Sequence, residues 1–309
     1  ISNTTTAPIK VLNAKKVILT LADNTTNTIT DSSRLSTEED YSAAIYSKED
    51  LIINGNGTLN VNAGYRNGIK STDDCIIVSG TLNITSTEDG IIGKDLCRVV
   101  AGDININAGS DGIKSTYDTD TTKGNVIIEG GNITIKASND GIQAENILVI
   151  NDGTINIKTN NGAADTTQTH TDNMYMDRGG FGFNNNKTTT TTDDTVESRK
   201  GIKAGNMLII NDGDITIDSD DDSVHCNSEI YIYGGTINAA TGDDGVHADD
   251  LLTVNGGTIN ITQCYEGIEA DDIVINDGDI SVVSSDDGIN SSDGSITING
   301  GNLLINASG

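Results

Sequence analysis

Three stretches of the chain place two adjacent carboxylates at the start of a turn. They are Asp221-Asp222, Asp243-Asp244 and Asp286-Asp287, and the last two pairs directly precede a glycine. Aspartate before glycine is common in tight turns, where the carboxylate caps backbone amides. That interpretation accounts for the single acids Asp89, Asp111 and Asp140, but it accounts poorly for doubled ones. Clustered carboxylates are the hard oxygen ligands that Ca²⁺ prefers, in sets of about six to eight.

The charge distribution supports a cation at these turns. The formal net charge is −28, and residues 204–309 contain 20 Asp or Glu but no Lys or Arg. Like charges stacked across neighbouring strands destabilise a sheet, so we expect this half to need an external counter-ion. The sequence predicts bound calcium, in more than one ion, and the expected metal ligands are Asp221, Asp222, Asp243, Asp244, Asp249, Glu266, Glu269, Asp271, Asp286, Asp287 and Asn290. A calcium shared by Asp222, Asp244 and Glu266 is the specific expectation.

An internal repeat determines how these turns are positioned. Glycines at the start of segments such as GTLNV and GTINI recur with spacings of 23, 22, 29, 22, 60, 22, 22, 21 and 23 residues. Each unit holds a short apolar run, an alternating strand and a third short segment such as GIKS or GVHA. Repeats of this length indicate a solenoid. We therefore predict an all-β, single-domain, right-handed parallel β-helix of about ten coils of ~22 residues, with three short strands per coil.

The inward and outward positions of the alternating strand follow from the repeat. Ten residues are expected to stack inward, namely Leu59, Leu82, Ile104, Ile133, Ile155, Ile215, Ile237, Ile259, Ile280 and Leu303. Asparagines are expected to stack on the opposite side of the strand, at Asn60, Asn83, Asn105, Asn156, Asn238 and Asn260. Cys75 and Cys97 occupy the same slot on adjacent coils, which leaves a disulfide and a reduced pair both open.

The chain reads as one domain over residues 1–309. Residues 1–45 are expected to form an N-terminal cap and an irregular first coil, because the end of a solenoid must be covered. A long insertion spans residues 163–200, and a shorter one surrounds residues 115–124. Loops of the longer size are usually either functional or disordered, and both remain open here.

The composition limits the classes of partner that this chain is expected to bind. Strong acidity excludes nucleic acid as a direct partner, and no apolar run approaches the ~20 residues that span a bilayer, so no membrane insertion is expected. The N-terminal sequence ISNTTTA is typical of a mature or trimmed start. No signal peptide is recognisable in this sequence. The oligomeric state stays open.

The 22-residue coils with GGTINI strands and DDG turns resemble the secreted clostridial-type carbohydrate-binding-domain proteins, β-helices that are similar to calcium-dependent pectate lyases. The resemblance covers nearly all of residues 44–309. It implies a secreted or cell-surface bacterial protein, whose signal peptide is absent from this sequence. It also implies binding of plant-cell-wall polysaccharide, including acidic pectin and cellulose, with bound calcium. The related lyases place a third carboxylate three residues after a paired Asp-Asp. This chain has His247 and Asn290 at the two matching positions.

A non-catalytic, calcium-binding carbohydrate-binding protein is the favoured function. A pectate-lyase-type enzyme is the first alternative; β-elimination needs a basic residue beside calcium, and Lys203 is the candidate, with Lys200 and Arg199 close by. A calcium-stiffened surface adhesin is the second alternative. A polysaccharide, expected to be acidic, is the predicted partner, and the expected substrate-binding residues are Lys70, Lys114, Lys203, His225, His247, Tyr265, Phe181 and Phe183.

Overall fold

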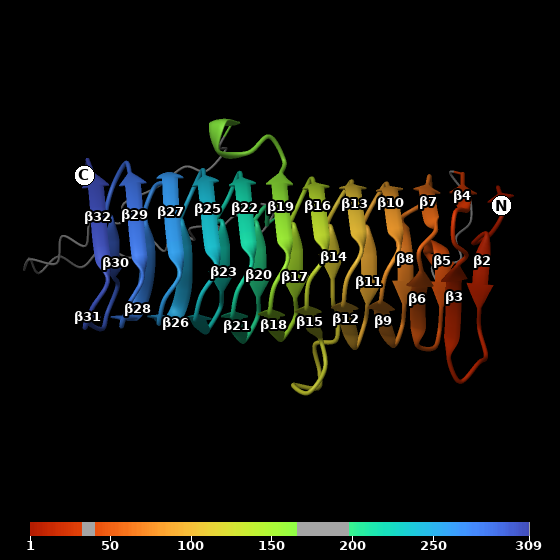
Figure 1. Cartoon of the computed structure of the whole chain (residues 1–309), viewed down its shortest axis with the longest axis horizontal. Helices are drawn as coiled ribbons and strands as arrows, with labels where there is room; N and C mark the ends of the chain where they lie inside the picture. The colour runs from red at the N-terminus through yellow and green to blue at the C-terminus, as the bar shows by residue number, and fades with distance from the viewer. Residues whose placement is uncertain (33–40, 166–197, 309) are drawn as a thin grey trace, which may run out of the picture.

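The computed structural model is the parallel β-helix that the repeat predicts. It describes residues 1–32, 41–165 and 198–308. Successive coils stack along one axis, with the two chain ends at opposite ends of the rod (Figure 1). Every strand pair is parallel, and each coil contributes one strand to each of three ladders that run the length of the rod.

Ladder A is a 12-stranded sheet built from the alternating segments. Its strands are β1 (Ser2–Asn3), β4 (Thr26–Asp31), β7 (Thr58–Ala63), β10 (Thr81–Ser86), β13 (Asp103–Ala108), β16 (Asn132–Ala137), β19 (Thr154–Thr159), β22 (Asp214–Ser219), β25 (Thr236–Thr241), β27 (Thr258–Gln263), β29 (Asp279–Ser284) and β32 (Asn302–Ala307).

Ladders B and C together form a 20-stranded sheet, because β26 and β28 run continuously from one ladder into the other. Ladder B contains β2 (Ile9–Val11), β5 (Ala43–Ser47), β8 (Asn67–Ser71), β11 (Ile91–Gly93), β14 (Ile113–Lys114), β17 (Ile142–Ala144), β20 (Ile202–Ala204), β23 (Val224–Cys226), the first part of β26 (Val246–Val254), the first part of β28 (Ile268–Ile275) and β30 (Ile289–Ser291). Ladder C contains β3 (Val17–Leu21), β6 (Leu51–Gly55), β9 (Asp74–Ile77), β12 (Leu96–Val99), β15 (Asn125–Ile128), β18 (Ile147–Ile150), β21 (Met207–Ile210), β24 (Glu229–Ile232), the later parts of β26 and β28, and β31 (Ile296–Ile298).

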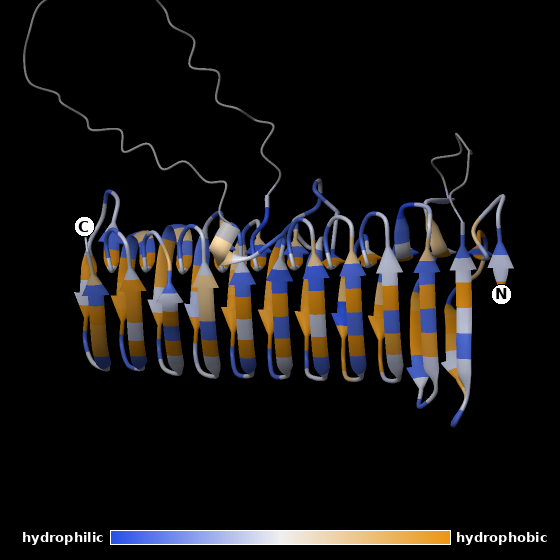
Figure 2. Ribbon diagram, turned by 90° about the horizontal axis from the view of Figure 1, so that it is seen from above, coloured by the Kyte–Doolittle hydropathy of each residue, from blue (hydrophilic) through white to orange (hydrophobic). Residues whose placement is uncertain are grey.

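The core lies inside the three ladders, where identical slots stack in register. Ile215 pairs with Ile155 and Ile237, and all three are fully buried. Outward positions of ladder A carry the predicted asparagine stack, in which the Asn83 amide donates to Asn60 Oδ1 (2.9 Å). Hydrophobic and hydrophilic bands therefore alternate along each strand of ladder A (Figure 2). Apolar and polar residues alternate in the sequence of these strands because successive side chains point to opposite faces of the sheet.

Two regions interrupt the regular coils. The N-terminal segment adds β1 to β4 to the same three ladders, with β1 pairing with β4 and β3 with β6. The loop of residues 115–124, between β14 and β15, projects from the rod (Figure 1). Of the long insertion, the structure describes a short 3₁₀ helix, η2 (Ala163–Asp165), and residues 198–200.

All four cysteines are buried free thiols. Cys75 and Cys97 are paired in register, as their spacing predicts. Among residues 1–32, 41–165 and 198–308, no helix has the length and apolarity needed to cross a membrane.

Candidate cation and carbohydrate site

The acidic residues lie in the turn from ladder A into ladder B. The glycines of this turn form a column, because the adjacent coil leaves no room for a Cβ atom at these positions. A Cβ added at Gly245 would lie 2.4 Å from Ile261 Cδ1 and 2.5 Å from the Gly267 carbonyl oxygen. Gly112 is just as confined, by Ile135 and by the Gly141 carbonyl oxygen. The chain passes so close to the next coil that only glycine fits without displacing it. This tight passage aligns the residue before each glycine in a column along the rod.

In the N-terminal half, that column caps backbone amides. The Asp111 amide N–H donates to Asp89 Oδ1 (3.1 Å), and the Asp140 N–H donates to Asp111 Oδ1 (3.0 Å). The Lys200 N–H continues the series by donating to Asp140 Oδ1 (2.8 Å). Each carboxylate thus satisfies an amide of the following coil, as the turn interpretation of these three acids predicts.

Lys200 occupies the same column and neutralises the first acid pair. Its Nζ lies 2.7 Å from Asp222 Oδ2 and 2.9 Å from Asp221 Oδ1. Burial opposes ionisation of Asp222, but Lys200 and the two nearby histidines outweigh it and hold the pKa of Asp222 well below its usual range. Burial likewise disfavours the Lys200 cation, yet Asp222 and Asp221 raise its pKa above the ordinary value.

Lys200 therefore supplies Asp221 and Asp222 with a counter-charge from within the chain, while calcium binding by this acid pair stays a prediction. Lys200 stands 22 residues before Asp222, so the repeat stacks the two residues on adjacent coils. Arg199 also faces this coil, with Nη1 2.8 Å from Oδ2 of the fully buried Asp220. The sequence signal for this pairing was a lysine in a slot that other coils fill with an acid.

The next two coils bring imidazoles and carboxylates together. Ladder B pairs His225 with His247, and His247 with Glu269. The two rings meet edge to face with centroids 4.9 Å apart. His225 Nδ1 lies 2.8 Å from Asp222 Oδ2, and we refer to the group Asp222, Asp244, His225, His247 and Glu269 as the histidine cluster.

His247 is surrounded by carboxylate oxygens from three coils. Its Nδ1 lies 3.1 Å from Asp244 Oδ2, and 3.8 Å from both Asp222 Oδ2 and Glu269 Oε2. Its Nε2 lies 3.6 Å from Asp249 Oδ1. Although burial opposes the imidazolium, the hydrogen bond with Asp244 and the surrounding acids raise the pKa of His247 to about 9.

Beyond Asp222, several carboxyl groups have raised pKa values. Burial, with Asp222 and Asp244 close by, raises the pKa of Asp243 to about 8. Burial and Asp244 raise the pKa of Glu269 to about 7, and burial also raises the pKa of Asp244. Burial, which disfavours a charged carboxylate, is the first cause of each of these shifts, and neighbouring acids add to it.

Towards the C-terminus, the turn column presents oxygen and amide groups. The Asn290 amide donates to Glu266 Oε2 (2.9 Å) and to Glu269 Oε1 (3.4 Å). Burial raises the pKa of Glu266, the Asn290 hydrogen bond lowers it, and Glu269, Asp287 and Asp286 raise it further. We call Glu266, Asp286, Asp287 and Asn290 the oxygen cluster; Glu269 is kept with the histidine cluster.

The predicted ligand Asp271 makes its contacts away from the histidine cluster. Its Oδ1 accepts a hydrogen bond from the Ser292 hydroxyl (2.7 Å), and its carbonyl accepts one from Ser291 (2.6 Å). It lies after β28 has left ladder B, on an exposed corner. No contact that the described residues show joins it to the histidine cluster.

The predicted substrate-binding lysines line one column with the histidines. Lys203 pairs in register with Gln143 on one side and with His225 on the other. Lys114 Nζ is bonded to Asp111 Oδ2 (2.6 Å), Lys70 Nζ donates to Ser42 Oγ (3.3 Å), and Lys203 Nζ donates to Ser198 Oγ (3.2 Å).

Tyr265 is half-buried beside the acidic turns, and its backbone N–H donates to the Asp243 carbonyl oxygen (2.8 Å). Phe181 and Phe183 lie outside the described residues.

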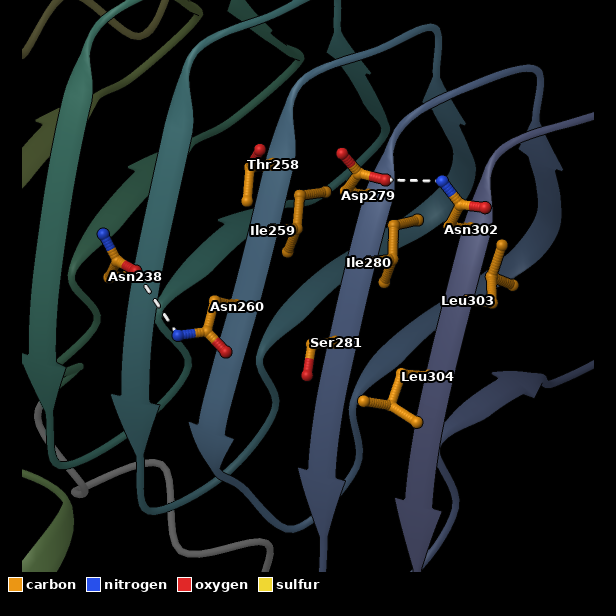
Figure 3. A pocket seen from close by; sticks show the side chains of 10 residues that line it. All are labelled: Asn238, Thr258, Ile259, Asn260, Asp279, Ile280, Ser281, Asn302, Leu303 and Leu304. Carbon is orange, nitrogen blue, oxygen red and sulfur yellow. Dashed lines mark hydrogen bonds between the residues drawn. The ribbon is translucent and has the colours of Figure 1, made fainter.

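A second surface is the outer face of ladder A. A shallow cavity of about 420 Å³ spans β25, β27, β29 and β32 there. Its amides pair across the strands, with Asn260 donating to Asn238 (3.4 Å) and Asn302 to Asp279 (2.7 Å), and Leu304 stands beside them (Figure 3). The residues that line this cavity are neutral polar and apolar ones with the single charged side chain Asp279, so the cavity lacks the histidines and crowded acids of the turn column.

Comparisons with known proteins agree with this architecture. A family model described as carbohydrate-binding domain-containing protein matches residues 1–245 and 243–309. A protein of that description from Acetivibrio thermocellus is 40% identical over 88 residues, which are 27% of this chain and 31% of the relative, so the match spans about a third of that protein. The solved structure of a polysaccharide lyase-like protein from C. thermocellum, a gadolinium derivative, is similar over 52% of this chain and 66% of its own, with 36% identity and a TM-score of 0.50.

Proposed function

Because the chain belongs to the family of carbohydrate-binding domain-containing proteins, we propose that it is a non-catalytic protein that binds an acidic plant-cell-wall polysaccharide with the help of calcium. The proposed ligand class is polyuronate, such as pectin, whose carboxylates need cationic partners. Such polymers lie outside the cell, so the proposal places the protein at the cell surface or among secreted proteins.

One observation carries this proposal: the in-register column that follows the turn glycines changes its charge along the rod. Lys70, Lys114 and Lys203 supply cations in the N-terminal half, whereas Glu269 and Asn290 supply oxygens in the C-terminal half. Neighbouring coils repeat at roughly 4.8 Å, so the column offers regularly spaced contacts to a linear polymer. Uronate carboxylates can contact the lysines directly, but they need a cation at the acidic end.

The oxygen cluster is where we place that calcium. Its carboxylates and the Asn290 Oδ1 atom are oxygen ligands, as calcium requires, and Glu269, Asp287 and Asp286 add to the effect of burial in raising the pKa of Glu266. A gadolinium derivative is named for the polysaccharide lyase-like relative, and gadolinium is a hard cation with a similar preference for oxygen. When bound, calcium would join protein carboxylates to those of the ligand.

The lysine nearest the paired acids argues for binding rather than catalysis. Lys200 is held as a cation by Asp221 and Asp222, so it cannot accept a proton from substrate in this arrangement. Lys203, the base that a lyase would use, donates to Ser198. A lyase thus remains the alternative for which Lys203 is the residue to test.

Retention in an affinity gel containing polygalacturonate tests the proposal. We expect retardation with calcium, loss of retardation with chelator, and no ultraviolet absorbance from unsaturated product. Lys203→Met should weaken retardation several-fold, whereas Lys16→Met, in the first coil, should not. Unsaturated product that disappears in Lys203→Met would instead identify a lyase.

A parallel gel with soluble cellulose derivatives separates acidic from neutral recognition. Equal, chelator-insensitive retardation in both gels would contradict the acidic preference and point to the outer face of ladder A. Absence of retardation in either gel would overturn carbohydrate binding and favour the surface adhesin.

A further inference from the structure

We propose that the histidine cluster is a site for a zinc-class transition-metal ion, held by His247 Nδ1, Asp244 and Glu269, with one position open to solvent. This site is separate from the all-oxygen calcium site of the proposed function, and it does not depend on carbohydrate binding.

The spacing of the ligand atoms fits one small ion. The ligand atoms of Asp244, His247 and Glu269 all lie within 4.8 Å of one another. Zinc binds nitrogen and carboxylate oxygen at about 2.0–2.2 Å in tetrahedral geometry, which separates two ligand atoms by roughly 3.4 Å. The separations from His247 Nδ1, 3.1 Å to Asp244 Oδ2 and 3.8 Å to Glu269 Oε2, lie on either side of this value.

The outer nitrogens of both imidazoles give a second, independent observation. Each ring aims Nδ1 into the cluster and turns Nε2 outward to an acceptor. His225 Nε2 lies within hydrogen-bond distance of Asn227 Oδ1 (2.9 Å), whereas His247 Nε2 makes a longer charge contact of 3.6 Å with Asp249 Oδ1. Metal-ligating histidines carry this kind of outer partner, because it fixes the tautomer whose inner nitrogen is free to bind the ion.

The chemistry of the set favours a transition metal over calcium. Calcium takes oxygen ligands, whereas here an imidazole nitrogen stands at the centre of the group. Four carboxylate oxygens lie within 4 Å of the ring nitrogens of His247. A divalent ion at Nδ1 would bring more positive charge to Asp244 and Glu269 than the single proton it replaces.

The fold holds the ligands in place and leaves access. His225, His247 and Glu269 sit in register on β23, β26 and β28, which fixes their spacing through backbone pairing. Asp222 is already engaged by Lys200 and by His225, so it flanks the ion instead of binding it. The side chains of His247 and Glu269 are 26% and 20% exposed, respectively, so water or a ligand can reach the remaining position.

Metal titration of the chelator-treated protein, without polysaccharide, tests the proposal. The His170→Gln background removes the third histidine of the chain. We expect one equivalent of Zn²⁺ to bind in competition with a chromophoric chelator, and Co²⁺ to give the intense visible absorption of a four-coordinate ion. An excess of Ca²⁺ should not displace either ion.

Variants assign the ion to the cluster. His247→Gln should lower zinc affinity by more than about 100-fold, and Asp249→Asn by about 10-fold, the range for an outer partner. Asp250→Asn is the matched control, because Asp250 accepts from the Ser228 hydroxyl (2.7 Å) instead of facing His247. It should leave zinc affinity unchanged.

The proposal is overturned if zinc does not bind, if Ca²⁺ displaces it, or if His247→Gln binds zinc as tightly as the background protein. Equal losses in Asp249→Asn and Asp250→Asn would also overturn it, since they would indicate a diffuse charge effect. Should His247→Gln fail to fold, the cobalt spectrum and the Asp249/Asp250 pair still decide. Failure here leaves polygalacturonate retention untouched, so the two proposals fail separately.

Discussion

The two halves of the rod place acids in the same turn slot but surround them differently. Asp111 caps the amide of the next coil and pairs with Lys114, whose pKa is raised because Asp111 outweighs the effect of burial. Asp244 occupies the equivalent slot two coils after Lys200, yet its neighbours are His247, Glu269 and Asp222. The acid-glycine turn by itself therefore indicates a structural cap, and the column beside it decides whether charge is left over.

Lys200 marks the boundary between the halves. It is the last residue of the turn column to carry a positive charge, and it balances Asp221 and Asp222 across one coil step. Beyond it, the partners that the described residues show for the turn acids Asp244 and Glu266 are an imidazole and an amide, respectively. In the turn column, divalent cations are expected on the C-terminal side of this boundary.

The largest expected effect comes from removing that boundary charge. Lys200→Met removes the lysine partner of two buried carboxylates, which should lower the free energy of unfolding by about 3–5 kcal/mol. Lys114→Met, which removes a half-buried lysine from the single carboxylate Asp111, should cost less, about 1–2 kcal/mol. Denaturant unfolding monitored by circular dichroism measures both.

Added calcium gives a further test of this boundary, because the ligand atoms of Asp221, Asp222 and Asp243 lie within 4.8 Å of one another. Without Lys200, added Ca²⁺ should recover part of the lost stability. Equal losses in the two lysine variants would contradict the boundary.

The glycine column should behave alike in both halves. Gly112→Ala and Gly245→Ala each place a Cβ about as close to a carbonyl oxygen of the next coil (2.5 Å in both). Overpacking of this kind costs about 2–3 kcal/mol, and we expect similar drops in melting temperature. A loss confined to one variant would show that the two turns are not equivalent.

The pH dependence of stability should be set by the C-terminal half. The folded-state pKa values of Asp243 (about 8) and Glu269 (about 7) are raised above their unfolded values. A raised carboxyl pKa contributes stability that is complete below the unfolded pKa and is lost as pH rises through the folded one. In chelator, the melting temperature should therefore fall between pH 5 and pH 8.

Asp243→Asn isolates one part of that dependence, because it removes a group that titrates near pH 8. The variant should flatten the upper part of the profile. A melting temperature that rises over pH 5–8 in chelator, or an unchanged slope in Asp243→Asn, would contradict the assignment of crowding to this half.

The smallest expected effect concerns the asparagine stack on ladder A. Asn83 donates to Asn60 (2.9 Å) and accepts from Asn105 (3.1 Å), whereas Asn260 makes one longer contact to Asn238 (3.4 Å). Asn83→Ala should cost about 1 kcal/mol and Asn260→Ala about half of that. Thermal melts of the two variants, beside an Asn299→Ala variant with its single bond to Asn276 (2.8 Å), measure the difference.

Much of the fold was predictable because the repeat reports directly on stacking. The inward series from Leu59 to Ile280 and the outward asparagines appear in register as expected. The N-terminal segment was harder to read, since residues 9–11 and 17–21 join ladders B and C without the glycine signal of the later coils. The partner of the first acid pair was misjudged, because a charge count over residues 204–309 stops short of Lys200.

A fixed repeat places identical slots one strand apart. The amino-acid sequence was therefore enough to predict the solenoid, its period and the columns in which acids, lysines and histidines stack. Which carboxylates are neutralised became visible only in the folded structure. Ion pairs depend on side-chain reach between coils, so Lys200 removes Asp221 and Asp222 from the list of free acids while His247 gathers Asp244 and Glu269 around one nitrogen. Those distances of a few ångströms, which the repeat alone cannot specify, separate a capped turn from a cation site.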